Sequence, residues 1–247
     1  MQQEPDYTVS SQIAEELVGG FGSVSIVKVD TRTLFRKESI QQTANAAVTE
    51  GIIQRYLNAG EYKVKHGEFT FDVCRLEGIY KTTSDTVVLL MQVCGTPLLD
   101  YLRSNPTHIR TILKGVLLLL QTLQQRVQFM HYDLKLQNLL IDERTNTIFM
   151  IDFGWARLRA DGNLIAQSEW HIVQDKRFNA SYDMYYLLAS AWCMLNSSLD
   201  TFLYAKLESI CKSICPNMTP DVVGFFEYNQ LAPLLDDWQV KFTKTID

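Results

Sequence analysis

The sequence lacks three features that would assign it to a special structural class. Its most apolar run, Val116 to Leu120, is far too short to cross a membrane. Its five cysteines are odd in number and form no Cys-x-x-Cys pair, which argues against a disulfide framework and against a zinc site. No long block of like charge occurs, and the net charge of −5 argues against a broad nucleic-acid-binding surface.

What remains is the composition of an ordinary soluble globular protein, with 47% hydrophobic and 21% charged residues. A chain of 247 residues can bury a full core, either as one domain or as two lobes that share a cleft. Residues 1–6 are polar and acidic, unlike a secretory signal peptide. We therefore expect a cytoplasmic protein with no membrane partner and no nucleic-acid partner.

Two short apolar runs, residues 139–142 and 147–151, are separated by polar turn residues and predict a β-hairpin. The hairpin would hold two polar loops side by side, which contribute the carboxylates of Asp133 and Asp152 and the amide oxygen of Asn138. Oxygen ligands of this kind suit Mg²⁺, which keeps several waters and takes one or two carboxylates together with phosphates. The other carboxylate would then be free to orient a hydroxyl group that attacks phosphorus.

The pattern His-x-Asp-x-Lys-x-x-Asn over residues 131–138, followed by Asp-Phe-Gly at residues 152–154, resembles the catalytic and metal-binding loops of eukaryotic-type protein kinases. The resemblance spans residues 17–188. The compact chain is also similar to divergent kinases of large DNA viruses, for which the location would be the host cytoplasm or nucleus.

This resemblance implies an α+β, bilobal fold in a single domain, residues 1–247. A small β-rich N-lobe would cover about residues 1–92, and a helical C-lobe about residues 93–247. The implied cofactors are ATP and Mg²⁺, the implied partner is a protein substrate, and the expected state is a monomer.

The resemblance also assigns roles in the two loops. Asp133 would act as the base toward the substrate hydroxyl, and Lys135 would neutralise charge on the transferred phosphoryl group. A lysine two residues after the aspartate is typical of kinases that act on serine and threonine. Asn138 and Asp152 would hold Mg²⁺, whereas His131 is expected to pack rather than to react.

Residues 17–24 read Leu-Val-Gly-Gly-Phe-Gly-Ser-Val and join two predicted strands, residues 13–18 and 23–29. A glycine-rich turn lets backbone N–H groups approach phosphates closely. The stretch is similar to the kinase pattern Gly-x-Gly-x-Phe-Gly-x-Val, except that Leu17 replaces the first glycine. By this resemblance Gly19, Gly22 and Val24 would bind the nucleotide.

A predicted strand at residues 33–37 ends at Lys37, which the resemblance pairs with the α- and β-phosphates and with Glu50 on a predicted helix. Kinases usually have alanine two positions before this lysine, beneath the adenine, whereas this chain has Phe35. A shift of register by one residue would place Arg36 in the lysine's position instead.

Residues 41–57 and 107–127 predict helices, residues 58–67 predict a loop, and residues 69–76 and 86–93 predict strands. The strand at residues 86–93 resembles the strand that leads into the kinase hinge. Met91 would then be the gatekeeper residue, and the backbone from Gln92 to Cys94 would meet the adenine. Leu140, in the first strand of the hairpin, completes the nucleotide-binding residues that the resemblance implies.

Several positions depart from the kinase pattern. Tyr132 stands where many kinases have an arginine that pairs with a phosphorylated activation loop, and Ser168 is the only hydroxyl-bearing residue between Asp152 and Phe178. We therefore expect activity without activation-loop phosphorylation. The Ala-Pro-Glu that usually closes this segment is absent. Asp183 resembles the buried kinase aspartate that accepts hydrogen bonds from the backbone of the catalytic loop.

Three functions remain open. The first is an ATP- and Mg²⁺-dependent kinase that phosphorylates serine and threonine hydroxyls of proteins. A kinase of the same broad fold acting on sugars or aminoglycosides is favoured by the missing Ala-Pro-Glu and by the short tail after Asp183. A non-catalytic pseudokinase that binds a partner is favoured by Leu17 and Phe35.

Overall fold

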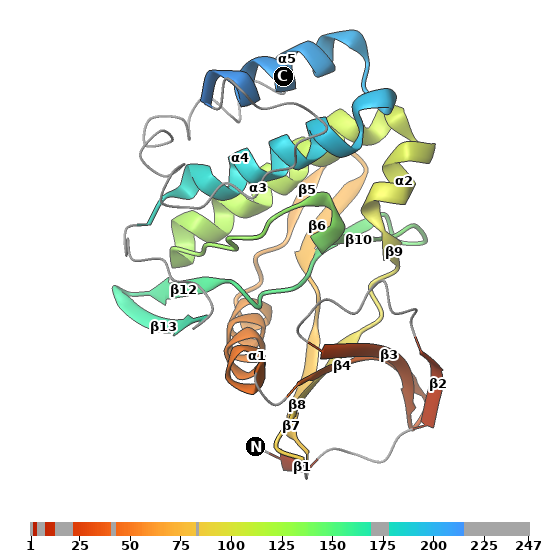
Figure 1. Ribbon diagram of the computed structural model, residues 1–247, viewed down its shortest axis with the longest axis vertical. Helices are drawn as coiled ribbons and strands as arrows, with labels where there is room; N and C mark the ends of the chain where they lie inside the picture. The colour runs from red at the N-terminus through yellow and green to blue at the C-terminus, as the bar shows by residue number, and fades with distance from the viewer. Residues whose placement is uncertain are drawn as a thin grey trace.

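The computed structural model describes residues 2–3, 8–12, 22–40, 43–82, 84–168 and 178–214, and the structural statements below refer to this part of the chain. The architecture is α+β, as the sequence predicts, with a β-rich N-terminal part and a helical C-terminal part. Figure 1 shows a large sheet at one end of the molecule and α3, α4 and α5 at the other. None of the helices in the described ranges is long and apolar enough to cross a membrane.

A six-stranded sheet forms the N-terminal part. Its strands, in spatial order, are β1 (Gln2–Gln3), β7 (Leu76–Lys81), β8 (Val87–Gln92), β4 (Arg32–Ser39), β3 (Gly22–Val29) and β2 (Thr8–Gln12). Alternate residues of β3, β4 and β8 form one small apolar core, namely Val27, Val29, Leu34, Val88 and Leu90. The opposite face carries Phe35 and Lys37, because side chains alternate along a strand. β3 and β4 confirm the strands predicted at residues 23–29 and 33–37, and the strand predicted at 13–18 lies outside the described residues.

Helix α1 (Ala44–Ala59) packs against β7 and β8 on the face of the sheet that carries Lys37. The sequence predicts this helix at residues 41–57, which agrees apart from its ends. Gly51 lies where the helix approaches the sheet most closely, because a Cβ there would stand 2.6 Å from Cδ1 of Ile79. The helix therefore lies tightly against the sheet one residue after Glu50.

A second sheet lies between the first sheet and the helices, and contains the predicted hairpin. Its strands, in spatial order, are β5 (Val64–His66), β6 (Phe69–Val73), β11 (Thr147–Met150), β10 (Leu139–Asp142) and β9 (Thr96–Pro97). β10 and β11 pair antiparallel, which confirms the hairpin, and β6 pairs in parallel with β11.

The second sheet corrects two predictions. Residues 58–67 were expected to form a loop, but they include β5. The single strand expected at residues 69–76 is divided between β6 and β7, which belong to different sheets. The chain divides at Cys74 because the apolar residues of β6 pack into the main core with the helices, whereas β7 pairs with β8. The two sheets are therefore not separated by one boundary along the sequence.

The helical part is built around α3 (Ile109–Val127), whose apolar face is buried as the sequence predicts for residues 107–127. α4 lies beside α3, and α5 packs on α4. The remaining elements are α2 (Leu98–Ser104), η3 (Pro106–His108), η4 (Leu136–Asn138), α4 (Ala180–Met194), η5 (Asn196–Ser198) and α5 (Thr201–Ile214). The sequence suggests Ser181 as the cap of α4, but Asn179 caps it, because its Oδ1 accepts a hydrogen bond from the Ser181 N–H at 3.0 Å.

A second hairpin follows residues 152–154 and is absent from the sequence predictions. It consists of β12 (Arg157–Ala160) and β13 (Asn163–Gln167), which turn at Asp161 and Gly162. β13 contacts α1, so the hairpin adds support to the helix that carries Glu50. Ser168, at the end of β13, is buried, with 1% of its surface exposed.

Asp183 on α4 holds the loop of residues 131–138, as the sequence predicts. Its Oδ2 accepts a hydrogen bond from the His131 N–H at 2.7 Å, and its Oδ1 accepts one from the Tyr132 N–H at 2.8 Å. Tyr132 has a φ of +63°, a left-handed conformation that is unfavourable for a bulky residue. The two hydrogen bonds and the burial of Tyr132 against Tyr182 stabilise this strained residue.

The carboxyl of Asp183 makes the stability of the fold depend on pH. Burial raises the pKa of Asp183 from 3.8 to about 6, against the opposing effect of the two backbone N–H groups. A carboxyl that binds its proton more tightly in the folded chain favours folding at low pH, and this contribution is lost as the pH rises through that window. The difference in pKa corresponds to about 3 kcal/mol.

We expect urea unfolding of wild type and Asp183→Asn to reveal this dependence. The variant should be less stable throughout, because one acceptor oxygen must serve two N–H groups. Between about pH 4 and pH 7, the wild type should lose up to about 3 kcal/mol of unfolding free energy relative to the variant. If the unfolding free energies of the two proteins changed with pH in the same way, the pKa of Asp183 would not be raised.

Candidate active site

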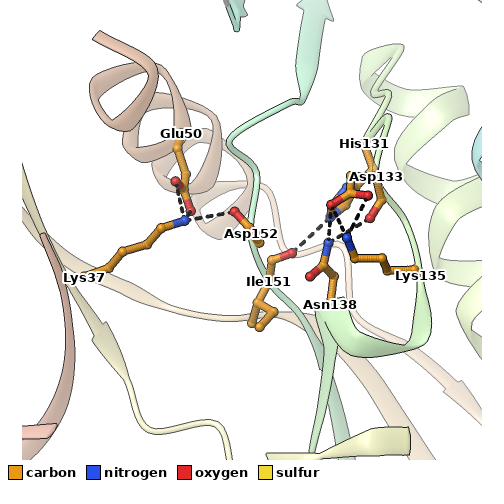
Figure 2. A network of polar contacts seen from close by, with 8 residues as sticks. All are labelled: Lys37, Glu50, His131, Asp133, Lys135, Asn138, Ile151 and Asp152. Atoms are coloured by element: carbon orange, nitrogen blue, oxygen red, sulfur yellow. Dashed lines mark hydrogen bonds and ion pairs between the residues drawn. The ribbon is translucent and has the colours of Figure 1, made fainter. Parts of the chain in front are cut away.

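Three charged side chains from three different elements meet at one point (Figure 2). Lys37 Nζ lies 2.9 Å from both carboxylate oxygens of Glu50 and 2.9 Å from Oδ1 of Asp152. Lys37 belongs to β4, Glu50 to α1, and Asp152 follows β11. We call these three residues the Lys37 cluster. The pairing of Lys37 with Glu50 that the sequence predicts is confirmed.

The charges of the Lys37 cluster favour the ionised states of Lys37 and Asp152. Burial alone would lower the pKa of Lys37, but the carboxylates of Asp152 and Glu50 outweigh it and raise that pKa. Burial raises the pKa of Glu50, whose side chain is 4% exposed, and Lys37 partly offsets this. Although desolvation opposes it, Lys37 lowers the pKa of Asp152. The Asp152 side chain remains 42% exposed and so can accept a further ligand.

The strand register decides between Lys37 and Arg36. Arg36 lies on the other face of β4, where its Nη1 pairs with Oε2 of Glu38 at 2.7 Å. Lys37 points to the face that α1 covers. The interpretation that places Arg36 in the lysine's position is therefore wrong, and Phe35 lies two residues before the lysine on the same face.

A second network lies within residues 131–138 (Figure 2). Lys135 Nζ lies 2.9 Å from Oδ2 and 3.1 Å from Oδ1 of Asp133, and Asn138 Nδ2 donates to the same Oδ2 at 2.9 Å. Asn138 Nδ2 also donates to the backbone carbonyl of Asp133 at 2.8 Å. We call these residues the Asp133 network. The contacts fix the Asp133 carboxylate, and the Asp133 side chain is 16% exposed.

His131 joins the network to the cluster. The His131 ring is fully buried, and its Nε2 lies 3.0 Å from the carbonyl oxygen of Ile151, the residue before Asp152. The ring also packs against Phe153, with the ring centroids 5.4 Å apart. His131 therefore packs, as the sequence predicts, and holds the two polar loops beside each other.

Asp152 and Asn138 offer oxygen atoms suited to a magnesium ion. The amide nitrogen of Asn138 is engaged with Asp133, which orients its oxygen away from Asp133, and Asp152 uses only Oδ1 toward Lys37. Within the described ranges, no group of three or more histidine, cysteine or acidic side chains is arranged to hold a metal. Two protein oxygens without a closed cage fit Mg²⁺, which completes its shell with water and phosphate oxygens.

Two of the residues predicted to bind a nucleotide, Gly22 and Val24, lie on β3 beside the strand of Lys37. Val24 is the cross-strand partner of Lys37. Gly22 opens β3 with a φ of +148°, and a Cβ there would lie 1.9 Å from the carbonyl oxygen of Glu38, so the position requires glycine. Gly19 lies outside the described residues.

The predicted hinge residues are more deeply engaged than expected. Met91, Leu140 and Ile151 pack around a small core of Cys74, Cys94 and Phe149. The Gln92 N–H donates to the Arg75 carbonyl at 2.9 Å, and the Gln92 carbonyl accepts from the thiols of Cys74 and Cys94. Cys94 itself is fully buried.

Three polar residues near the site are absent from the sequence predictions. Gln54 and Asn58 lie on α1, one and two turns after Glu50, and both bond to the backbone at Cys74. Tyr186 on α4 has its pKa raised by burial and by the negative charge of Asp133. Gln54 interrupts the apolar residues of the helix predicted at residues 41–57, one turn after Glu50, but nothing in the sequence indicates its partner. Asn58 falls in the region that the sequence predicts as a loop.

A family model of the protein kinase domain matches residues 16–198, about three quarters of the chain. The match includes every residue of the Lys37 cluster and of the Asp133 network, and it ends just before α5. Because the agreement extends over both sheets and the helices that carry these residues, the chain belongs to the protein kinase domain family, whose activity is phosphoryl transfer.

Proposed function

We propose that the protein transfers the γ-phosphoryl group of ATP to serine or threonine hydroxyls of protein substrates. In this reaction the acceptor oxygen forms a bond to phosphorus while the bond from phosphorus to the departing ADP oxygen breaks. Lys37 would pair with the α- and β-phosphates, held in place by Glu50. Asp152 and Asn138 would hold Mg²⁺, which neutralises the charge of the phosphate oxygens.

The observation that carries the proposal is the contact between Lys37, Glu50 and Asp152, held beside the Asp133 network. Phosphoryl transfer needs positioned charges rather than covalent catalysis, and the two groups supply both charge and position. Asp133 would accept the proton of the acceptor hydroxyl or orient that hydroxyl. Lys135, which lies 2.9 Å from Asp133, would neutralise charge on the phosphoryl group in transit.

Two features bear on substrate and control. Lys135 stands two residues after Asp133, the spacing typical of kinases that act on serine and threonine. Ser168, the residue after β13, is buried, so its hydroxyl is not accessible to a phosphorylating enzyme in this conformation. The lysine favours a kinase that acts on serine and threonine. The buried Ser168 favours activity without phosphorylation of the segment that follows Asp152.

Phosphate transfer from labelled ATP to peptides that carry serine, threonine or tyrosine tests the proposal. Phosphatase-treated wild type should label serine and threonine peptides, and Asp133→Asn should lower kcat by about 10²–10⁴-fold, because the hydroxyl loses its base. Asp161→Asn is the matched control: Asp161 is an exposed turn residue with a φ of +50°, which asparagine also tolerates, and its rate should not change.

Three results would contradict the proposal. Labelling of tyrosine peptides alone would refute the acceptor class. Labelling of sugars or aminoglycosides in place of peptides would support the small-molecule kinase. An unchanged rate in Asp133→Asn would remove Asp133 from the reaction.

The pseudokinase alternative depends on Phe35. Its register partners are Ile26 on β3 and Met91 on β8, and its ring is only partly buried on the face that carries Lys37. A base bound beside the phosphates would lie against this face, opposite Leu140. A phenylalanine there narrows the space for the base in comparison with alanine.

We expect wild type to bind Mg·ATP in spite of Phe35, and Phe35→Ala to enlarge the space for the base. In titration calorimetry, an ATP analogue with a bulky N6 substituent should gain at least about tenfold in affinity relative to ATP, or about 1.4 kcal/mol. Phe202→Ala, which removes a 56% exposed ring on α5, should change neither affinity. Binding of ATP to Phe35→Ala but not to wild type would favour the pseudokinase instead.

A further inference from the structure

We propose that Gln54 and Asn58 are positioning residues for the active site, and that they act by anchoring α1 to the peptide unit at Cys74. This inference rests on the proposed function, because the residue they place is Glu50. The junction of Gln54, Asn58 and the backbone of residues 74–76 is called the Cys74 junction below.

Three hydrogen bonds form the α1 side of the junction. Gln54 Nε2 donates to the carbonyl oxygen of Cys74 at 2.6 Å, and Asn58 Nδ2 donates to the same oxygen at 3.2 Å. In return, the Leu76 N–H donates to Oδ1 of Asn58 at 2.8 Å. Two side chains from successive turns of α1 thus hold one short stretch of backbone.

The other side of the junction reaches the remaining parts of the site. The Cys74 N–H donates to the carbonyl of Met150, the last residue of β11, two residues before Asp152. The Cys74 thiol lies 3.5 Å from the carbonyl of Gln92, at the end of β8, and β8 pairs with β4, which carries Lys37. The Cys74 junction therefore connects α1, which carries Glu50, directly to the end of β11, and connects it to β4, which carries Lys37, through β8.

The ends of helix α1 contribute little to fixing its orientation. Its first residue follows Thr43, which makes no side-chain cap, and there is no acidic residue in the first turn and no basic residue in the last. Its buried face beside Glu50 is formed partly by small residues, Ala46, Ala47 and Gly51. Small residues allow a close approach to the sheet but offer little side-chain surface to resist rotation or sliding of the helix.

Three polar residues on one face of α1 couple the Cys74 junction to the contact between Glu50 and Lys37. Glu50, Gln54 and Asn58 are spaced by four residues, so they lie along one face of α1. A rotation of α1 that broke the Cys74 junction would also move the Glu50 carboxylate away from Lys37. The two contacts thus fix the same rotation of the helix at two points along its length.

Gln54 shows that the contact is not mere packing. It is 1% exposed, and within the described residues its Oε1 has no hydrogen-bond partner. A buried amide oxygen without a partner is unfavourable, and leucine would fill the same volume without that cost. The glutamine is explained by what its Nε2 does, which is to donate to Cys74.

A double-mutant cycle between Asn58 and Glu50 tests the inference. The variants are Asn58→Leu, Glu50→Gln and both together, with kcat/KM for phosphoryl transfer and the urea midpoint measured for each. Eight residues of helix place Asn58 about 12 Å from Glu50 along the axis, so direct contact between them cannot produce coupling. Arg55→Leu is the control, because it places the same side chain on the exposed face of α1.

Asn58→Leu should lower kcat/KM about tenfold in the wild type but less than about twofold in Glu50→Gln, because the anchor then has no carboxylate to place. Arg55→Leu should stay within about twofold of its parent in both backgrounds. The urea midpoints should show the same pattern: Glu50→Gln should lower the midpoint less when Asn58 is already leucine. Gln54→Leu should repeat these results, and Asn58→Leu suffices if that buried variant does not fold.

Additive effects in both measurements would overturn the inference, because two independent structural losses add. If wild type transfers no phosphoryl group, the proposed function fails, and the urea cycle alone decides whether the Cys74 junction positions Glu50. Coupling in urea without activity would support the junction and reject the kinase. Activity without coupling would support the kinase and reject the positioning role of the Cys74 junction.

Discussion

A carboxylate is stable in a protein interior only where a counter-charge or hydrogen-bond donors replace its lost hydration, and for Glu50 the counter-charge is Lys37. Removing one partner from such a buried pair typically costs about 3–5 kcal/mol, because the other charge remains desolvated. The requirement draws α1 onto the face of β4 that carries Lys37. Asp152 completes the arrangement by contacting the same Nζ, so that three separate elements converge on one ammonium group.

A second buried carboxylate, that of Asp183, fixes the loop of residues 131–138, which carries Asp133. The Asp183 carboxylate accepts hydrogen bonds from the backbone N–H groups of His131 and Tyr132. Both polar loops contain a residue with a φ of +63°, Tyr132 in one and Asp152 in the other. Such strained residues persist where surrounding contacts determine them, and here α4 and the Lys37 cluster supply those contacts. The interior of the protein thus holds the reactive groups in conformations that the isolated loops would not keep.

The sequence predicted the parts of this account that depend on local pattern. The hairpin and the central helix follow from the pattern of apolar residues, and the pairing of Lys37 with Glu50 follows from the resemblance to protein kinases. The division of residues 69–76 between two sheets was not predictable, because β6 has the same alternation in either sheet and only its parallel partner β11 decides. Nor were Gln54 and Asn58, whose bonds go to backbone atoms of Cys74 and Leu76, since backbone acceptors leave no trace in a sequence.

The central claim is that the Lys37 cluster is a working site for Mg²⁺ and ATP, and thermal unfolding of wild type and Asp152→Asn with ATP tests it most directly. Ligand at about 100 times its dissociation constant adds roughly 2.7 kcal/mol, which raises the midpoint by roughly 5–10 °C for a chain of this size. We predict that wild type shows a larger rise with Mg²⁺ than without it, and that Asp152→Asn loses the Mg²⁺-dependent part. An equal Mg²⁺-dependent rise in both proteins, or none in either, would contradict the account.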